Sequence, residues 1–399
     1  MLDVAVARAR ILEKFSAGGS ETVSLADGCG RVLASPLTAR LSNPPVSISS
    51  MDGYALKAED AQDGATLRIV GEAPAGHPSC LTVEKGTCLR LFTGSQIPAG
   101  ADMVMIQENV RREGDHATLL SAGRVGQFIR KEGQDFRKGD ILVPAGKKIG
   151  PRDIGLAAAG GHIWLPVSRR PRIGVLATGD EIVLPGDPAS PDSIVNSGAF
   201  MITALLKSLG ADAILLPVAR DNAESLSAAI GQAHTLDLLV TIGGASVGTY
   251  DVVRSTLEAH GLALDFWKIA MRPGRPLMFG QLGHTPVIGL PGNPVAALVC
   301  SLVFVAPALR KLLGQPVPDK METESAVLGA DIGENDQRQD FVRCRLTPQA
   351  DGQLPLATPF SSQDSAQLNI FVQSQALLIR APFAPAEKAG APCRILRLP

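Results

Sequence analysis

The stretch LDLLVTIGGASVGTYDVVRSTLEAHG, residues 236–261, sets out the fold of the central part of this 399-residue chain. An apolar run typical of a buried strand leads into a glycine-rich loop, and a helical pattern follows the loop. The loop carries the hydroxyl of Ser246 and ends on the carboxylate of Asp251. Such loops bind phosphate groups through backbone N–H groups. Because a carboxylate would repel a phosphate, we expect a cation between Asp251 and the bound group.

The same alternation of strand and helix continues on both sides of this stretch. Residues 170–315 contain three more strand patterns: RIGVLATGDEIV, ADAILLPVAR and TPVIGLPGN. A helical pattern follows each one: NSGAFMITALLKSLG, DNAESLSAAIGQAH and PVAALVCSLVFVAPALRKLLG. In the second of these helices, Asp221 and Glu224 have the spacing of a capping box. Alternating strands and helices at this spacing predict a mostly parallel, doubly wound α/β sheet.

The flanking segments have different patterns. Residues 65–130 alternate short β patterns with turns (ATLRIVGEA, TCLRLFTGS, DMVMIQENV, HATLLSA), which predicts a small β-rich domain. Residues 318–399 return to β-like alternation and predict a second, separate β domain. Residues 1–40 look helical before an extended piece near SPLTARLSNPPVS. In ILVPAGKKIGPRDIGLAAAGG, from residue 141, a helix is predicted to start at Pro-Arg-Asp and stop at Gly-Gly.

Composition excludes several classes of protein. The net charge is −1, which gives no sign of a nucleic acid or anionic membrane partner, and aromatic residues are only 4%. The longest apolar run, residues 294–309, is interrupted by Ser301 and Pro307, and we expect it to be too short to span a membrane. The N-terminal MLDVAVARARILEKF predicts an amphipathic helix without the apolar region of a signal peptide. The six cysteines form no CxxC pair, so we expect reduced, mostly buried thiols in a cytoplasmic protein.

Polar or glycine-rich turns follow all four predicted parallel strands, at the edge where open α/β sheets bind ligands. In chain order they contain Thr178, Asp180 and Glu181; Arg220 and Asp221; Gly243, Gly244, Ser246, Gly248 and Asp251; and Pro291, Gly292, Asn293 and Pro294. Each turn has a purely structural alternative. Asp221 suits a helix cap, Asn293–Pro294 suits the first positions of a helix, and the glycines suit a tight turn. Their convergence on one edge nevertheless indicates a cleft.

The turns also indicate what the cleft binds. No GK[ST] follows the glycine-rich loop, and it is not a GxGxxG motif with a distant carboxylate, so a nicotinamide site is disfavoured. Carboxylates beside a phosphate loop favour Mg²⁺, which binds one or two carboxylates together with substrate phosphates. The stiff loop in FWKIAMRPGRPL carries Lys268, Arg272 and Arg275, which suit an oxyanion clamp. The alternative is a solvated loop with surface charges.

Three stretches outside the sheet would be ordinary turns by themselves: SSMDGYAL with Asp52, LFTGSQIPAGADMVMIQE with Thr93, and GQDFRKGD with Asp135. Together with LATGDEIV, GGASVGTYD, RPGRPLMFG and GLPGNPVAAL, and in this order, they resemble the MoeA family of molybdopterin molybdenumtransferases. The molybdenum-inserting domain of gephyrin belongs to the same group. The resemblance extends over residues 1–399.

The resemblance implies a multidomain α/β plus β fold and a homodimer. The second domain of one subunit would face the third domain of the other, which would bring Asp52, Thr93 and Asp135 to the cleft. The implied domains are an elongated, discontinuous first domain at 1–40 and 140–168, a β-rich second domain at 41–139, a doubly wound, MogA-like α/β third domain at 169–316, and a small β-barrel-like fourth domain at 317–399.

The resemblance also implies an activity: insertion of molybdate into adenylylated molybdopterin, with Mg²⁺ and release of AMP. The implied roles are catalysis by Asp52, Thr93 and Asp135; Mg²⁺ placement and anhydride cleavage by Glu181, Asp221 and Asp251; phosphate binding by Gly243, Gly244, Ser246 and Gly248; oxyanion binding by Lys268, Arg272, Arg275, Arg343 and Ser365; and shaping of the cofactor-binding loop by Pro291, Asn293 and Pro294. The dithiolene sulfurs that receive the metal belong to the substrate, so no protein cysteine is needed.

The chain departs from the family pattern at three places. Gln134 stands where members often have Glu, Arg272 and Arg275 stand where they often have Lys, and SSQDSAQLNIFVQSQALL, residues 361–378, differs around Ser365. The alternatives are therefore a specialised or degenerate paralogue (tungstate-using or client-specific), a molybdopterin adenylyltransferase, or a non-catalytic scaffold. Beyond the substrates, the expected partners are the adenylyltransferase and molybdoenzyme clients, with no nucleic acid and no membrane.

Overall fold

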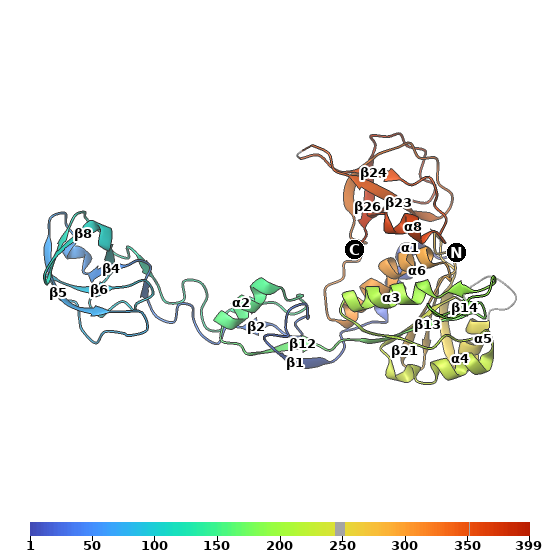
Figure 1. The fold of residues 1–399 in the computed structure, drawn as a ribbon, viewed down its shortest axis with the longest axis horizontal. Helices are drawn as coiled ribbons and strands as arrows, with labels where there is room; N and C mark the ends of the chain where they lie inside the picture. Colours follow the sequence, from blue (N-terminus) through green and yellow to red (C-terminus); the bar gives the residue numbers. More distant parts are fainter. Residues whose placement is uncertain (244–251, 351) are drawn as a thin grey trace. The chain divides into compact units, whose positions relative to one another are not determined.

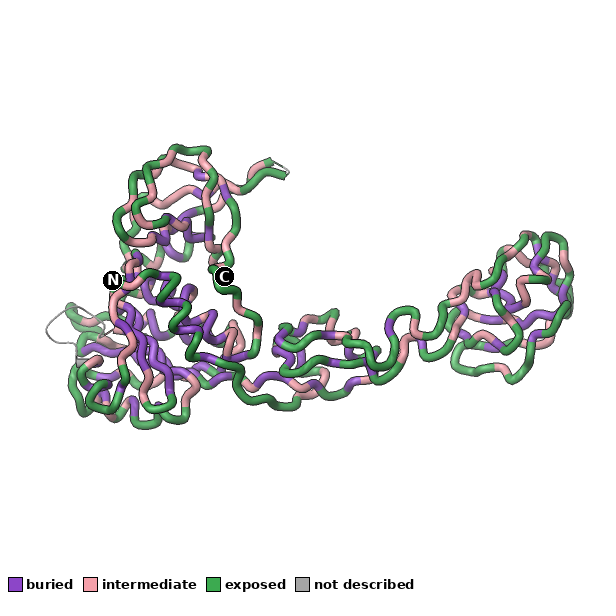
Figure 2. The backbone as a smooth tube through the Cα atoms, turned by 180° about the vertical axis from the view of Figure 1, so that it is seen from behind, coloured by how far each residue is buried: buried purple, intermediate pink, exposed green. Residues whose placement is uncertain are grey.

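The computed structural model describes residues 1–243, 252–350 and 352–399 (Figure 1). The chain divides into two compact units. Unit 1 combines Met1–Glu21 with Ser168–Pro399, and unit 2 is Thr22–Val167. Each unit has its own buried strands, drawn in purple in Figure 2.

The main sheet of unit 1 is the doubly wound sheet that the strand and helix patterns predict. Its order is β16-β13-β17-β21-β20-β18. The first four strands are parallel, and β20 and β18 add an antiparallel edge. The strands are β13 (Arg172–Ala177), β16 (Asp212–Leu215), β17 (Leu238–Ile242), β18 (Leu262–Trp267), β20 (Met278–Leu282) and β21 (Thr285–Leu290).

Helices cover both faces of this sheet (Figure 1). One face packs against α4 and α5 through a cluster that includes Leu226 and Leu257. The opposite face carries α3 and α6. The helical segments of unit 1, together with the short parallel strands β14 and β15, are α1 (Val4–Glu13), β14 (Ile182–Val183), β15 (Ile194–Val195), α3 (Ser197–Ser208), α4 (Ala223–Ile230), η3 (Ala233–Thr235), α5 (Val252–Ala259), α6 (Pro294–Cys300), the π-helical η4 (Ser301–Val305) and α7 (Ala306–Leu312).

Two sequence predictions about helices need correction. The cap of α4 is Asn222, whose side chain accepts the N–H of Ser225 at 2.8 Å, so the predicted capping box at Asp221 and Glu224 is wrong. Helix at the N-terminus covers only Val4–Glu13, and the remainder of residues 1–40 is mostly irregular backbone around two short strands.

The apolar run after β21 is longer than predicted. Ser301 bonds the carbonyl of Ala297 at 2.8 Å, and the π-helical turn comes just before Pro307, which lacks an N–H. Pro294–Leu312 is therefore one 19-residue helical segment, long and apolar enough to cross a membrane by length and composition alone. Since 83% of its most apolar window is buried inside the protein, we assign it as a core helix.

The C-terminal part of unit 1 is the second predicted β domain. Its strand order is β19-β23-β24-β22-β26-β25, and β25 also pairs with β23, which closes a small barrel. The parallel pairing of β19 with β23 joins this barrel to the loop between β18 and β20 of the main sheet. The elements are β19 (Met271–Arg272), β22 (Glu324–Leu328), β23 (Gln339–Thr347), β24 (Leu356–Pro359), α8 (Leu368–Val372), β25 (Ala376–Arg380) and β26 (Pro392–Arg397).

Unit 2 contains the first predicted β domain, a six-stranded sheet of order β7-β4-β6-β5-β9-β8. Its elements are β4 (Gly53–Leu56), η1 (Ala58–Asp60), β5 (Thr66–Ala73), β6 (Thr87–Leu91), β7 (Met103–Ile106), η2 (Gln107–Asn109), β8 (Val110–Glu113) and β9 (His116–Leu119). Three strand pairs and one helix complete the short elements: β1 (Ser20–Ser24) with β12 (Trp164–Ser168), β2 (Leu37–Thr38) with β11 (Ile141–Val143), β3 (Ile48–Ser49) with β10 (Ile129–Arg130), and α2 (Pro151–Ala159).

The cysteines match the expectation only in part. All six are free thiols. Cys88, Cys300 and Cys344 are buried, whereas Cys29 and Cys80 are exposed. The expectation of mostly buried thiols is wrong for these two.

Candidate active site

A cleft of about 940 Å³ lies within unit 1, at the edge formed by the carboxyl ends of the parallel strands. The turns after β13, β16, β17 and β21 line it, together with the start of α3 and the loop from Met271 to Pro276. The C-terminal domain adds Arg338 and residues 363–366. The structure thus brings together these predicted residues: Glu181, Asp221, Gly243, Arg272, Arg275, Pro291, Asn293, Pro294 and Ser365. Gly244, Ser246, Gly248 and Asp251 lie outside the described residues.

One side of the cleft is an acidic corner formed by Asp180, Glu181 and Asp221. The backbone N–H of Asp221 donates to Asp180 Oδ1 at 3.0 Å, and Arg220 Nη1 donates to the Asp180 carbonyl at 2.6 Å. Partial burial raises the pKa of Asp221, and repulsion from Asp180 and Glu181 raises it further. Crowded carboxylates of this kind favour a bound cation.

The acidic corner supplies two carboxylates to the cleft, from Glu181 and Asp221. Within the described ranges, no group of three His, Cys, Asp or Glu side chains is placed to hold a metal ion. Two carboxylates suit Mg²⁺ nonetheless, because it commonly takes its remaining ligands from substrate phosphates and water.

Two glycines shape the floor of the cleft beside this corner. Gly243 has φ +92°, and a Cβ there would lie 2.7 Å from the carbonyl oxygen of Thr178. Gly179 has φ +144°, and a Cβ there would lie 2.7 Å from a carboxylate oxygen of Glu181. Both positions therefore require glycine, because a side chain would displace the turn or the Glu181 carboxylate.

The basic residues of the cleft have unequal partners. Arg275 is exposed, lines the cleft and forms no ion pair with a described residue. Arg272 Nε donates to Asp340 Oδ2 at 3.0 Å, and Arg272 Nη2 also contacts Asp340 and donates to Asn335 at 3.2 Å. Lys268 is not among the described lining residues, because its Nζ lies 3.9 Å from the centroid of the Trp267 ring. The structure therefore does not bring Lys268 into the cleft.

The atypical segment 361–378 reaches the cleft through Ser365. Asn293 Nδ2 donates to Ser365 Oγ at 2.8 Å, and the Val295 N–H donates to the Ser365 carbonyl at 3.2 Å. Asn293 occupies the cap position of α6, but its side chain forms no capping hydrogen bond. The interpretation of Asn293 as a pure cap is therefore wrong: its side chain connects α6 to the C-terminal domain.

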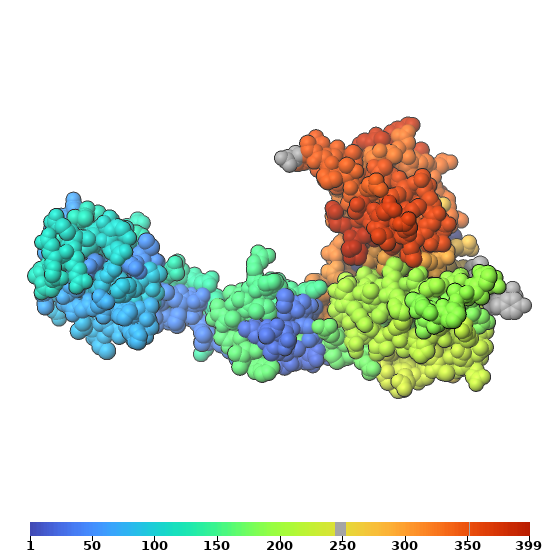
Figure 3. Space-filling model, viewed as in Figure 1, coloured from blue at the N-terminus to red at the C-terminus, as the bar shows by residue number. Residues whose placement is uncertain are grey.

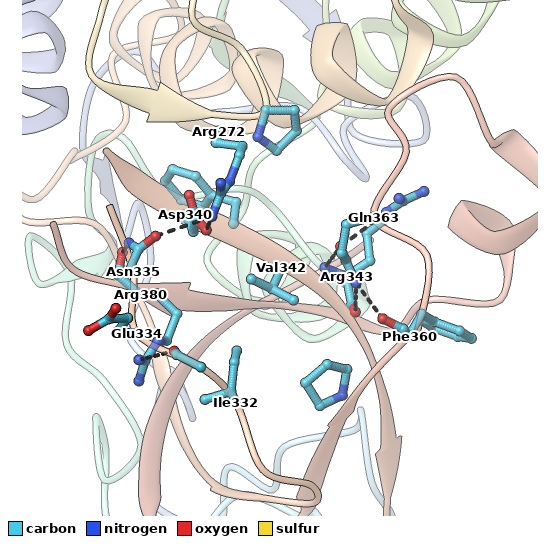
Figure 4. Close-up of a pocket in the computed structure, with 14 residues that line it drawn as sticks. Arg272, Ile332, Glu334, Asn335, Asp340, Val342, Arg343, Phe360, Gln363 and Arg380 are labelled. Atoms are coloured by element: carbon cyan, nitrogen blue, oxygen red, sulfur yellow. Dashed lines mark hydrogen bonds and ion pairs between the residues drawn. The ribbon is translucent and has the colours of Figure 1, made fainter. Parts of the chain in front are cut away.

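A second hollow, of about 410 Å³, lies in the C-terminal domain (Figure 4). It shares Arg272 and Gln363 with the cleft. Arg343 lines this pocket and is only 2% exposed. Its guanidinium donates to Gln363 Oε1 at 3.4 Å and to the carbonyls of Ser362 and Gln367 at 3.2 and 3.3 Å. It forms no ion pair with any described carboxylate, so a buried positive charge stands beside the cleft.

Two of the predicted residues in unit 2 are in contact. Asp52 Oδ1 accepts the backbone N–H and the hydroxyl of Thr93 at 2.7 and 2.8 Å. These two hydrogen bonds lower the pKa of Asp52. Asp135 Oδ2 accepts a hydrogen bond from Asn43 Nδ2 at 3.0 Å, and within the described part of the chain Asp135 forms no hydrogen bond with Asp52 or Thr93.

Sequence reasoning missed six polar residues of the described cleft lining as site residues: Thr178, Asn196, Ser197, Arg338, Gln363 and Asp364. Thr178 lies in the turn after the first predicted parallel strand, with no predicted role. Asn196 begins the predicted helix NSGAFMITALLKSLG and is the cap of α3. Arg338 lies in NDQRQD, which contains no motif, so only the fold could bring it to the cleft.

Comparisons with known proteins agree along the chain. Residues 2–161 match the model of the MoeA N-terminal region (domain I and II), residues 174–311 a probable molybdopterin binding domain, and residues 325–397 the MoeA C-terminal region (domain IV).

Similar curated proteins and solved structures carry related names. A molybdopterin molybdenumtransferase of Haemophilus influenzae is 34% identical over 95% of this chain and 94% of that protein. One of Nostoc sp. is 36% identical over 74% of this chain and 70% of that protein. The crystal structure of the molybdopterin biosynthesis MoeA protein of Pyrococcus horikoshii matches with a TM-score of 0.87 at 28% identity, covering 100% of this chain and 99% of that one.

Proposed function

Since the chain belongs to the MoeA family, we propose that it is a molybdopterin molybdenumtransferase of molybdenum cofactor biosynthesis. In the proposed reaction, molybdate is inserted into adenylylated molybdopterin and AMP is released. Molybdenum forms bonds to the two dithiolene sulfurs of the substrate, and one oxygen of molybdate leaves as water with the two thiol protons. Water splits the phosphoanhydride, which yields AMP and leaves the phosphate on molybdopterin.

The distribution of charge in the cleft carries this proposal. Glu181 and Asp221 stand on one side, while Arg275 and Arg338 also line the cleft. A substrate with a phosphoanhydride and an oxyanion co-substrate needs both a cation-binding corner and guanidinium groups. The backbone at Gly243 has room for a phosphate because no Cβ blocks it.

Mg²⁺ fits the acidic corner, and we propose that Glu181 and Asp221 hold it, with Asp251 as a further ligand. When bound, Mg²⁺ would neutralise the charge that develops on the phosphoanhydride during cleavage. Arg275 would orient the molybdate through bidentate hydrogen bonds. Ser365, whose hydroxyl oxygen accepts a hydrogen bond from Asn293, would donate its hydroxyl hydrogen to the same oxyanion.

We propose further that the enzyme works as a homodimer, with Asp52, Thr93 and Asp135 acting on substrate bound by the partner subunit. Mixing an Asp52→Ala subunit with an Asp221→Asn subunit should restore activity in the heterodimer, because one of its two sites has no substitution. Proven heterodimers without any restored activity would assign the whole site to one subunit.

The decisive experiment measures AMP release from adenylylated molybdopterin with Mg²⁺, in the presence and absence of molybdate. Molybdate-dependent AMP release is the expected result. Release with tungstate in preference to molybdate would identify a specialised paralogue. Formation of adenylylated molybdopterin from ATP, with no AMP release, would identify an adenylyltransferase instead. Binding of substrate with no turnover would contradict the proposed activity and favour a scaffold.

A further inference from the structure

The start of α3 forms one end of the cleft, and its lining has a different chemistry from the rest. We call it the α3 end, and its residues are Ile182, Ile194, Val195, Asn196, Ser197 and Gly198. Ile194 and Val195 are 57% and 46% exposed, which is high for such side chains. Residues around 190 lie on the outer surface of unit 1 (Figure 3). This end contains no described Lys or Arg among its lining residues.

Asn196 is the buried polar group of this end, being 4% exposed. Its backbone N–H donates to the Val183 carbonyl at 2.9 Å, and its Oδ1 accepts the Ala199 N–H at 3.1 Å as the cap of α3. Because the cap requires the oxygen on that side, the orientation of the amide is fixed. Nδ2 therefore points away from the helix, and no described residue accepts its hydrogen bonds.

A second unpaired group lies nearby. Thr178 is 4% exposed, and its hydroxyl has no hydrogen-bond partner within the described part of the chain. Its backbone N–H donates to the Ile242 carbonyl at 3.1 Å, and Ile242 also packs against the Gly198 position. Buried polar groups are normally paired, so two unpaired groups lining one cleft point to a bound partner.

The charges around this end decide what kind of group binds. Asn196 Nδ2 is a donor, so its partner is an acceptor. An anionic acceptor is disfavoured, because no guanidinium lines this end and the Ile194 N–H donates to the Glu181 carbonyl at 2.8 Å, which puts this end beside the acidic corner. Apolar side chains beside a single donor suit a flat, neutral heterocycle.

We propose that the α3 end is the subsite for a heterocyclic part of the substrate, with Asn196 Nδ2 donating to a carbonyl oxygen or ring nitrogen. This inference rests on the proposed function, whose substrate carries two heterocycles, the pterin and the adenine. Asn196 would thus both start α3 and select the ring. The phosphates and the oxyanion would occupy the part of the cleft lined by Arg275 and Arg338.

The test compares two caps that differ in their surroundings. Asn196→Ser keeps a capping oxygen and removes the amide donor. Asn222→Ser makes the same change at the cap of α4, which does not line the cleft. Binding of molybdopterin and of AMP, each alone and without Mg²⁺, is measured by calorimetry for both variants and the wild type.

Asn196→Ser should weaken binding of one probe by about tenfold, the effect of losing one hydrogen bond, while Asn222→Ser changes neither. Loss for molybdopterin assigns the pterin to the subsite, and loss for AMP assigns the adenine. If Asn196→Ser does not fold, Asn196→Asp keeps the cap oxygen and the size of the side chain, and the same loss is expected. Unchanged affinities in a folded variant would overturn the inference. Wild-type protein that binds neither probe would overturn the proposed function itself.

Discussion

The cleft beside the α/β sheet and the pocket in the C-terminal domain share Arg272, yet their charged side chains have different partners. In the pocket, Arg272 binds Asp340, and Arg380 binds Glu387 at 3.1 Å. Burial raises the pKa of Asp340, but Arg272 opposes the shift. In the cleft, by contrast, Asp221 has carboxylates as neighbours, and they raise its pKa further.

This difference separates charges that hold the fold from charges available to a ligand. Like charges without counter-ions reduce the stability of the fold. Clusters of like charge are therefore expected where a bound cation or anion neutralises them. Substitutions in the cleft should therefore change activity with little loss of stability. Substitutions in the pocket should lower stability with little change in activity.

The largest expected effect is on activity, at Asp221. Asp221→Asn should slow AMP release by at least about 100-fold, because it removes a carboxylate proposed to hold Mg²⁺ at the phosphoanhydride. The matched control is Asp192→Asn, which changes an exposed carboxylate of the same unit outside the cleft lining. Rates are measured at saturating Mg²⁺. A wild-type rate for Asp221→Asn would place the metal elsewhere.

Among substitutions in the pocket, we expect the largest loss of stability at Arg343. Arg343→Met removes hydrogen bonds that hold Ser362, Gln363 and Gln367, with a loss of about 3 kcal/mol and a fall in melting temperature of about 8 °C. Arg345→Met, on the same strand but exposed, should change the melting temperature much less.

Arg343→Lys tests whether this residue also contacts the oxyanion. If Arg343 only holds the fold, a folded Lys variant should keep the KM for molybdate while melting earlier. A large rise in the KM for molybdate would show that Arg343 contributes to oxyanion binding in the cleft, as the family resemblance implies.

The sequence predicted the main sheet of unit 1 well because its signals are local. Alternating apolar runs and helical patterns specify the parallel strands β13, β16, β17 and β21 and their helices, and turns at the ends of these strands must lie at one edge. The antiparallel edge strands β18 and β20 were not predicted. The cap of α4 shows the limit of such reasoning. Asp221 and Asn222 are both good caps, and the Asp180 carboxylate, which accepts the Asp221 N–H, lies 41 residues away in the chain.

Contacts that the local sequence does not reveal decide the partners of the predicted basic residues. Arg272 was predicted to bind an oxyanion, but its loop pairs with β23, and Asp340 is 68 residues away in the chain. Lys268 turns onto the neighbouring Trp267 ring, which a charge pattern does not reveal. Nothing in the local sequence identifies Arg275, rather than Lys268 or Arg272, as the residue that forms no ion pair or ring contact with a described residue.

Comparing Arg272 with Arg275 would sharpen the distinction between charges that stabilise the fold and charges that are available to a ligand. Arg275→Gln should raise the KM for molybdate by about tenfold, because it removes an exposed guanidinium that no described carboxylate engages. Arg272→Gln should lower the melting temperature by a few degrees through loss of the Asp340 contact, with a smaller change in KM. A larger rise in KM for Arg272→Gln would show that it leaves Asp340 to bind the oxyanion.

The smallest expected effect concerns the stability of the cleft itself. The pKa of Asp221 is raised in the folded protein, so its charged form disfavours the fold, and this cost appears as the pH rises through the folded pKa. Asp221→Asn should therefore melt about 1 °C above wild type at pH 7, a small gain because the carboxylate is only partly buried and solvent screens it. The gain should shrink as the pH falls through the folded pKa and should disappear below the ordinary value of 3.8, where both states are protonated.

Mg²⁺ supplies the control for this last prediction. If Asp221 helps to hold the ion, Mg²⁺ should raise the melting temperature of wild type at pH 7 and remove the advantage of the variant. Asp192→Asn should respond to Mg²⁺ as wild type does. A variant that melts below wild type at every pH would mean that the Asp221 carboxylate stabilises the fold, and the contrast between cleft and pocket would not hold at its acidic corner.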